Sequence, residues 1–132
     1  MDLVRTADRL MCDVVRLVQG AGLSEPQYNV LRILRGAGEE GLPCGRIAGQ
    51  MLTRAPDVTR LVDRLEEGGL VRRVRPPGAD RRIVLVRLTE AGRSLLDRLD
   101  EPVERLHRAQ FDGLTRAELR ELRRLLRRVR QE

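Results

Sequence analysis

Apolar residues recur every three or four positions over most of this chain, which is the spacing of amphipathic helices. The first such stretch ends at the glycine-rich residues 20–22, and its apolar positions are Leu3, Ala7, Leu10, Met11, Val14 and Val18. A second helix is expected from Ser24 to about Arg35. Ser24 and Gln27 have the spacing of a capping box, and Pro26 is tolerated in the first turn of a helix.

Two shorter helical segments, residues 44–52 and 55–70, follow with a turn at Thr53 between them, which is the pattern of a helix-turn-helix. The inner stripe of the longer segment is Val58, Leu61, Val62 and Leu65. The pattern then changes. Residues 71–75 and 82–88 are rich in β-branched side chains and partly alternate, so they predict a two-stranded ribbon beside the helix-turn-helix.

The C-terminal third returns to helical spacing. Thr89 can cap a long helix over residues 90–110, and Pro102 should bend it or loosen its hydrogen bonding; the apolar positions are Leu95, Leu99, Val103 and Leu106. Thr115 and Glu118 predict a capping box for the last helix, whose apolar side is Leu119, Leu122, Leu126 and Val129. The predicted fold is mainly α with a small β-hairpin, arranged as a winged helix-turn-helix.

The helices at the two ends of the chain have apolar stripes that are large for a domain of 132 residues. They can pack on each other within one chain, or they can pair across a two-fold axis, and we favour the second arrangement because symmetric dimers are the commonest soluble oligomers. A single domain is then expected, with dimerisation helices at 1–22 and 90–132 and a winged helix-turn-helix lobe at 23–89. The predicted dimerisation residues are Leu3, Leu10, Val14, Leu106, Leu119, Leu122, Leu126 and Val129.

Charge narrows the class of partner. Charged residues make up 35% of the chain, above the usual value of about 25%, and the net charge is +6. This balance favours a polyanionic partner, with nucleic acid before an acidic membrane surface.

Candidate catalytic and metal-binding chemistry is missing from the sequence. There is no GxSxG motif, no glycine-rich phosphate loop and no pair of ligands at metal spacing, and the single histidine, His107, has no plausible nucleophile nearby. Cys12 and Cys44 are too isolated for a disulfide framework or a zinc site. We therefore expect neither an enzyme nor a cofactor. Without a predicted targeting segment or membrane span, we expect a cytoplasmic protein with no membrane partner.

The second helix of a helix-turn-helix reads the major groove with side chains at its start. The candidates here are Thr53, Arg54, Pro56, Asp57, Thr59, Arg60 and Arg64. Arginine can bind guanine edges in a bidentate manner, and Arg64, one turn further on, is better placed for a phosphate. Asp57 could accept a hydrogen bond from cytosine, but we favour a role in stabilising the helix start. The alternative is a solvated face on which these arginines pair with neighbouring acids.

The ribbon carries an unusual concentration of arginine at its turn, RPPGADRR (75–82). A basic ribbon beside a recognition helix is expected to follow the DNA backbone and place an arginine in a narrow minor groove. The candidate wing residues are Arg73, Arg75, Asp80, Arg81 and Arg82. Asp80 can orient a neighbouring arginine through a charge-assisted bond. The alternative is a solubilising edge that prevents aggregation.

These segments together resemble the MarR family of winged-helix regulators. The resemblance covers nearly the whole chain and is carried by LSEPQYNVLRIL (23–34) and by the segment VTRLVDRLEEGGLVRRVRPPGADRRIVLVRLTEAGRSLL (58–96). It implies a homodimer on a pseudo-palindromic operator, usually as a repressor relieved by a small ligand or by thiol oxidation. It also implies a recognition helix at residues 55–68, with Asp80 and Arg82 as the acid and minor-groove arginine of the wing.

The sequence says less about the effector that such a protein would sense. The resemblance implies a ligand site between the dimer helices and the DNA-binding lobe, although Tyr28 is the only tyrosine available there. Cys12 stands beside Met11 and Val14, so we expect it to pack in the core and not to sense oxidants; Cys44 is also expected to be structural. His107 is expected at the surface or at an interface.

The function that these features favour is a sequence-specific, double-stranded DNA-binding transcriptional regulator. We expect a ligand-responsive repressor that acts as a homodimer, with a small-molecule effector of unknown identity as a further partner. The alternatives are a non-specific architectural DNA-binding protein, which would use the same basic wing without consistent base contacts, and a helical adaptor that binds only protein.

Overall fold

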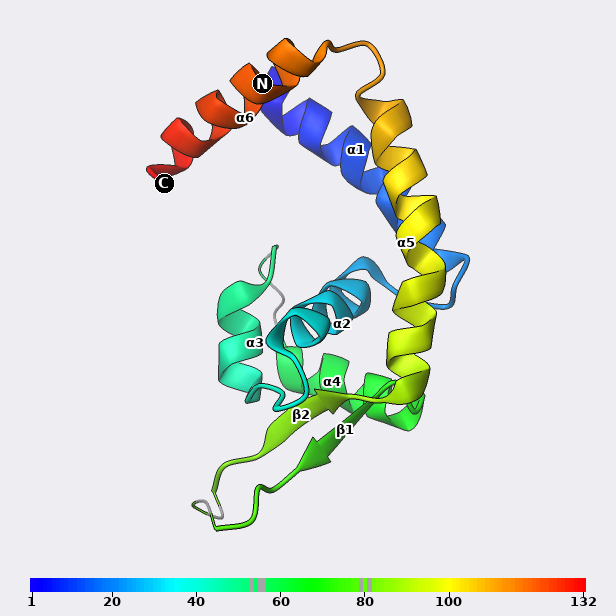
Figure 1. Ribbon diagram of the computed structural model, residues 1–132, viewed down its shortest axis with the longest axis vertical. Helices are drawn as coiled ribbons and strands as arrows, with labels where there is room; N and C mark the ends of the chain where they lie inside the picture. The colour runs from blue at the N-terminus through cyan, green and yellow to red at the C-terminus, as the bar shows by residue number, and fades with distance from the viewer. Residues whose placement is uncertain (53, 55–56, 79, 81) are drawn as a thin grey trace.

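The computed structural model describes all residues except 53, 55, 56, 79 and 81. Six helices and one hairpin are found over the described residues, in the order α1 (Asp2–Gln19), α2 (Glu25–Ala37), α3 (Cys44–Gln50), α4 (Val58–Glu67), β1 (Val71–Val74), β2 (Leu85–Leu88), α5 (Glu90–Gln110) and α6 (Arg116–Arg130). The predicted fold class is therefore confirmed. Figure 1 shows a lobe made of α2, α3, α4 and the hairpin, joined through α5 to the two terminal helices.

The lobe is built around α2. Leu31 and Leu34 of this helix are buried, and they belong to one core cluster with Ile47 of α3, Leu65 of α4 and Val86 of β2. Burying a leucine or isoleucine side chain stabilises a fold by about 1.5–3 kcal/mol, so this cluster is the main source of the lobe's stability. Both predicted capping boxes are present, one at the start of α2 and one at the start of α6.

Two backbone contacts fix the hairpin and α5 on the lobe. Leu42 and Val86 exchange backbone hydrogen bonds of 3.0 and 2.8 Å, which attaches β2 to the loop after α2. At Gly92, in the first turn of α5, an added Cβ would lie 2.2 Å from the carbonyl oxygen of Leu70. Glycine at this position therefore allows α5 to start directly against the end of α4 and the beginning of β1.

The hairpin is shorter than predicted. Strands were expected over 71–75 and 82–88, but pairing runs only from Val71↔Leu88 to Val74↔Leu85. Pro76 and Pro77 follow β1 and have no backbone N–H to donate to a ladder, so the pairing cannot continue past them. The residues beyond the last pair form the tip of the wing.

The terminal helices leave apolar side chains uncovered. No residue of α6 is buried, Leu125 and Val129 are 44% and 71% exposed, and Leu3 of α1 is 59% exposed. Over the described residues α6 packs closely against no other element, whereas α1 packs along α5. The arrangement in which α1 and α6 cover each other within one chain is thus not found.

Some residues expected at a dimer interface contact other parts of their own chain instead. Val14 packs against the core cluster of the lobe, and Leu10 and Leu106 face the same hollow between α1 and α5. Leu119, Leu122 and Leu126 remain only partly covered. The exposed apolar surface is accordingly concentrated on α6 and on the N-terminal turns of α1.

The prediction for Cys12 was wrong. Its side chain is exposed, because α1 turns the face that carries Val14 and Val18 toward the protein while Cys12 lies on the other side of the helix. Cys44 is partly buried and packs against the core cluster, as expected. His107 is exposed on α5, which agrees with a surface position.

Candidate nucleic-acid interface

The predicted recognition helix begins later than the sequence pattern indicated. It was expected to start at residue 55 and to end at 68 or 70, but α4 runs from Val58 to Glu67. The Asp57 carboxylate accepts a hydrogen bond of 3.0 Å from the backbone N–H of Arg60, which makes Asp57 the N-cap. This is the helix-start role that we favoured. Thr53 and Pro56, also predicted to contact DNA, lie outside the described residues.

The outward face of α4 carries the remaining candidates. Thr59, Arg60 and Arg64 are exposed, and so is Arg54 ahead of the helix. Among the described residues, neither Arg60 nor Arg64 has an acidic partner or a side-chain hydrogen bond. The alternative of a face neutralised by pairs within the helix is therefore not what the structure contains.

Arg73 pairs with two of the three acidic residues of α4. From β1 its guanidinium pairs with Asp63 at 2.6 Å and with Glu66 at 3.1 Å, and its backbone N–H donates to Glu66 at 2.7 Å. Burial opposes the charge of Arg73, but the two carboxylates outweigh this and raise its pKa. Arg73 was predicted as a wing residue that contacts DNA; in the structure it joins the hairpin to α4 by pairing with Asp63 and Glu66.

The tip of the wing is organised by Asp80. Its carboxylate accepts a hydrogen bond of 3.0 Å from the backbone N–H of Arg82, and its carbonyl accepts one of 2.9 Å from Ile83. The bond found for Asp80 is thus to the backbone of Arg82, and the expected bond to an arginine side chain stays a prediction. Arg75 and Arg82 are exposed on this loop, while Arg81 lies outside the described residues.

A shallow hollow of about 320 Å³ separates α4 from the start of α2. It is lined by Ser24, Pro26, Gln27, Asp57, Arg60, Leu61 and Arg64. The N-terminal end of α2 is the positive end of its macrodipole, so two arginines and a helix start face the same space. This arrangement suits a phosphate group of a nucleic acid that passes across the lobe.

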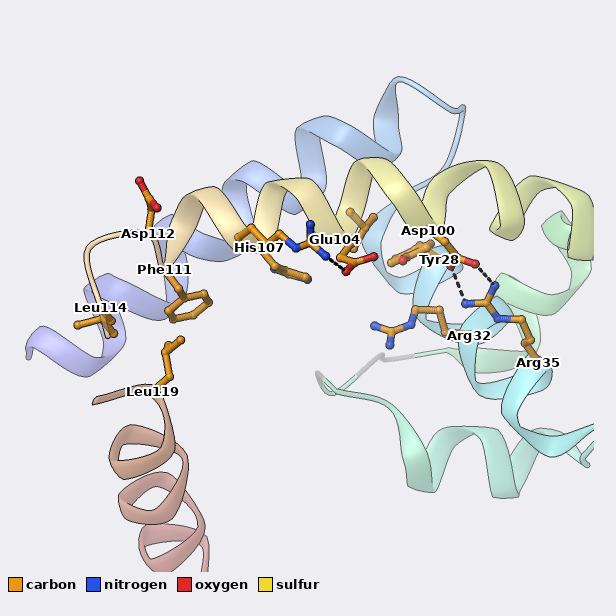
Figure 2. Close-up of a pocket in the computed structure, with 12 residues that line it drawn as sticks. Tyr28, Arg32, Arg35, Asp100, Glu104, His107, Phe111, Asp112, Leu114 and Leu119 are labelled. Atoms are coloured by element: carbon orange, nitrogen blue, oxygen red, sulfur yellow. Dashed lines mark hydrogen bonds and ion pairs between the residues drawn. The ribbon is translucent and has the colours of Figure 1, made fainter. Parts of the chain in front are cut away.

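A larger cavity of about 850 Å³ lies between the lobe and α5 (Figure 2), and it contains Tyr28, the tyrosine expected near a ligand site, with charged residues that the sequence pattern did not indicate. Arg35 of α2 donates two hydrogen bonds of 2.8 Å to the Asp100 carboxylate of α5, and Asp97 lies 3.5 Å away. The bonds from Arg35 lower the pKa of Asp100, against an opposing effect of burial. This pair joins positions 65 apart in the chain, and no local pattern could have indicated it.

One cation in this cavity has no carboxylate partner. The Arg32 guanidinium lies 5.8 Å from the centre of the Tyr28 ring and, within the described part of the chain, makes no ion pair. Burial raises the pKa of Tyr28, with Arg32 acting in the opposite direction. Figure 2 shows His107, Phe111 and Leu119 along the rest of the wall. A ligand with an anionic group and an apolar body matches this lining.

Within the part of the chain that the structure describes, no group of three or more histidine, cysteine, aspartate or glutamate side chains is arranged to hold a metal ion. No helix in that part of the chain is both long and apolar enough to cross a bilayer.

Comparison with known proteins gives consistent matches. The MarR family model matches residues 23–84. The HTH-type transcriptional repressor IacR of Pseudomonas putida is 32% identical over 124 residues, which is 94% of this chain and 72% of IacR. The solved structure of a MarR transcription factor from Planctomyces limnophilus is 45% identical and has a TM-score of 0.72; the match covers 94% of this chain and 89% of that one. The structure of CouR from Rhodococcus jostii, solved with p-coumaroyl-CoA bound, is 31% identical and has a TM-score of 0.81; the match covers 96% of this chain and 87% of CouR.

Proposed function

The chain belongs to the MarR family of transcriptional regulators, and from that premise we propose that it is a sequence-specific repressor that binds double-stranded DNA as a homodimer and responds to a small ligand. The relatives and neighbouring structures that it matches are regulators and not enzymes. The proposal is divided below into DNA contact, assembly and ligand response.

The observation that supports DNA binding is a set of exposed arginines that make no ion pair with any described residue. These are Arg60 and Arg64 of α4 and Arg82 of the wing. Arg73, by contrast, is held by Asp63 and Glu66 of α4. α4 would enter the major groove, and the wing would place Arg82 at the adjacent minor groove. Each phosphate that an arginine neutralises releases counterions, so affinity should fall steeply with salt.

Assembly follows from the uncovered apolar surface. The stripe of α6 and the exposed Leu3 of α1 would be buried against a second copy across a two-fold axis. Two lobes held at a fixed separation would then meet half-sites about one helical turn of DNA apart. The helices 1–22 and 90–132 would provide dimerisation and residues 23–89 would provide DNA contact.

The cavity between α2 and α5 supports a response to a ligand. CouR was solved with an acyl-CoA ligand, and this chain offers Arg32 as an unpaired cation beside Tyr28. A ligand that prefers one relative position of lobe and α5 would shift the separation of the two lobes. The Arg35–Asp100 pair spans that junction and would be part of the linkage.

The test is selection of bound oligonucleotides from a random pool, followed by competition between the selected site and random DNA. A regulator should prefer its site by about 10³ or more. A preference below about tenfold would instead favour the architectural alternative, and no binding at low salt would favour an adaptor that binds protein. Arg82→Ala should weaken binding to the selected site by about 1–3 kcal/mol.

A further inference from the structure

Much of the net positive charge of the chain lies at its C-terminal end. Residues 116–132 carry seven arginines against three acidic residues, whereas residues 90–115 carry four arginines against six acidic residues. Since the whole chain has a net charge of +6, a large share of the excess lies on α6 and its last residues. DNA binding by the lobe does not account for this charge.

The charge on α6 is only partly neutralised by ion pairs within its own segment. Arg124 pairs with Glu121 and Arg130 pairs with Glu132. The arginine stripe, by which we mean Arg116, Arg120, Arg123 and Arg127, makes no ion pair or hydrogen bond with any described residue. All four side chains are exposed.

The spacing of the arginine stripe places it along one side of the helix. Its members are four, three and four residues apart, so they form a row about 16 Å long at the rise of an α-helix. The apolar positions Leu119, Leu122 and Leu126 occupy the neighbouring side. A dimer that buries the apolar side would leave the arginine stripe beside the interface and open to solvent.

The position of α6 separates the stripe from the proposed operator surface. In Figure 1 the wing and α6 lie at opposite ends of the long axis of the molecule. DNA has a persistence length of about 150 base pairs, and bending even a 20–30 base-pair site costs several kcal/mol. A duplex that contacts the wing would therefore not also curve round to α6.

We propose that the arginine stripe of α6 binds the phosphate backbone of a second segment of duplex DNA, without sequence preference, so that the protein bridges two duplexes. The guanidinium group matches a phosphate in a bidentate geometry, and duplex DNA presents one charge per about 1.7 Å of its axis. An acidic membrane fits less well, because a basic amphipathic helix binds a bilayer through its apolar side. That side is occupied in the dimer, and in this respect the inference rests on the proposed function.

The experiment measures bridging directly. Beads that carry a random-sequence duplex are incubated with the full-length protein at about 50 mM salt, where phosphate contacts are strong, and then with a fluorescent second duplex. The test variant combines Arg120→Gln, Arg123→Gln and Arg127→Gln. The matched control combines Arg105→Gln, Arg124→Gln and Arg130→Gln, which removes the same charge from arginines that already have acidic partners.

The test variant should capture at least tenfold less of the second duplex than the wild type, and the control should retain most of the capture. Equal capture by test and control variants would overturn the proposal. Vesicles of phosphatidylserine and phosphatidylcholine form a parallel arm. Stripe-dependent binding to vesicles but not to duplex would assign the surface to a membrane and would also overturn it.

A third variant keeps this result separate from the proposed function. It adds Arg60→Gln, Arg64→Gln and Arg82→Gln in the lobe to the three α6 substitutions, so that neither surface can hold DNA. If the lobe binds DNA as proposed, this variant should lose the bead duplex that the α6 test variant still holds; equal binding of the bead duplex by the two variants would overturn the proposed function. Loss of bead binding here, together with normal capture of the second duplex by the α6 test variant, would overturn the inference on α6 alone.

Discussion

The winged lobe and the C-terminal helix α6 differ in how far their apolar side chains are buried. Leu31 and Leu34 of α2 and Ile47 of α3 are at most 1% exposed, whereas no residue of α6 is buried. In the lobe Arg73 pairs with Asp63 and Glu66 of α4, while the arginine stripe of α6 makes no ion pair with any residue that the structure describes. The apolar residues of the lobe share one buried core with Val18 of α1 and Leu96 of α5, whereas α6 and the first turn of α1 keep large apolar side chains exposed.

This difference indicates where mutations should act. Changes inside the lobe should alter the stability of a single chain, and changes on α6 should alter association with little effect on the lobe. The predictions below begin with the largest expected effect.

The largest effect is expected from Leu34→Ala in the lobe core. The side chain is 1% exposed and belongs to the core cluster, so its truncation should lower the free energy of unfolding by about 2–5 kcal/mol. Denaturant unfolding followed by circular dichroism measures this. Leu125→Ala, at a position that is 44% exposed, is the matched control and should lower the free energy of unfolding much less. Similar losses for both would mean that the contrast between the regions is false.

The next largest effect is expected from the apolar side of α6. Replacing Leu122 and Leu126 by alanine removes apolar area that we expect the partner to bury, and should weaken dimerisation by about 2–3 kcal/mol, or roughly 30- to 150-fold. Analytical ultracentrifugation measures the dissociation constant. The lobe should keep its helical content. An unchanged dissociation constant would place the dimer interface elsewhere.

Arg73 and Arg82 form a matched pair within the lobe that should separate stability from binding. Arg82→Ala should leave the unfolding midpoint nearly unchanged while it weakens operator binding, because Arg82 is exposed at the wing tip. Arg73→Ala should lower stability by about 0.5–1 kcal/mol, since it removes two ion pairs whose carboxylates, Asp63 and Glu66, are exposed to solvent. Fluorescence anisotropy and thermal unfolding on both variants check this. The reverse assignment of the two effects would contradict the role given to Arg73.

The smallest effect is expected at the junction between the regions. Asp100→Asn breaks an ion pair that is partly solvent-exposed, so it should cost only about 0.2–1 kcal/mol. The pKa of Asp100 is lowered in the folded state by Arg35, so its contribution is present above the ordinary aspartate pKa and is lost as pH falls through the lowered value. Wild type and variant should therefore converge in stability at acidic pH. A difference that is constant with pH would argue against an electrostatic linkage.

Features formed by neighbouring residues could be predicted well from the sequence. The capping boxes of Ser24 with Gln27 and of Thr115 with Glu118 are both present, because each needs only residues three positions apart. The helix order and the hairpin followed for the same reason. The start of α4 was predicted three residues too early, since periodicity does not locate a cap such as Asp57.

The sequence by itself determined which segments are helices, which is the hairpin, and that the chain carries an excess of arginine. Only the tertiary structure decided which arginines are available, because ion pairs depend on where distant elements meet. Arg73 lies on β1 but neutralises Asp63 and Glu66 of α4, and Arg35 meets a carboxylate 65 positions away. Cys12 was misplaced for the same reason: an apolar stretch shows that one side of a helix is covered, but packing decides which side.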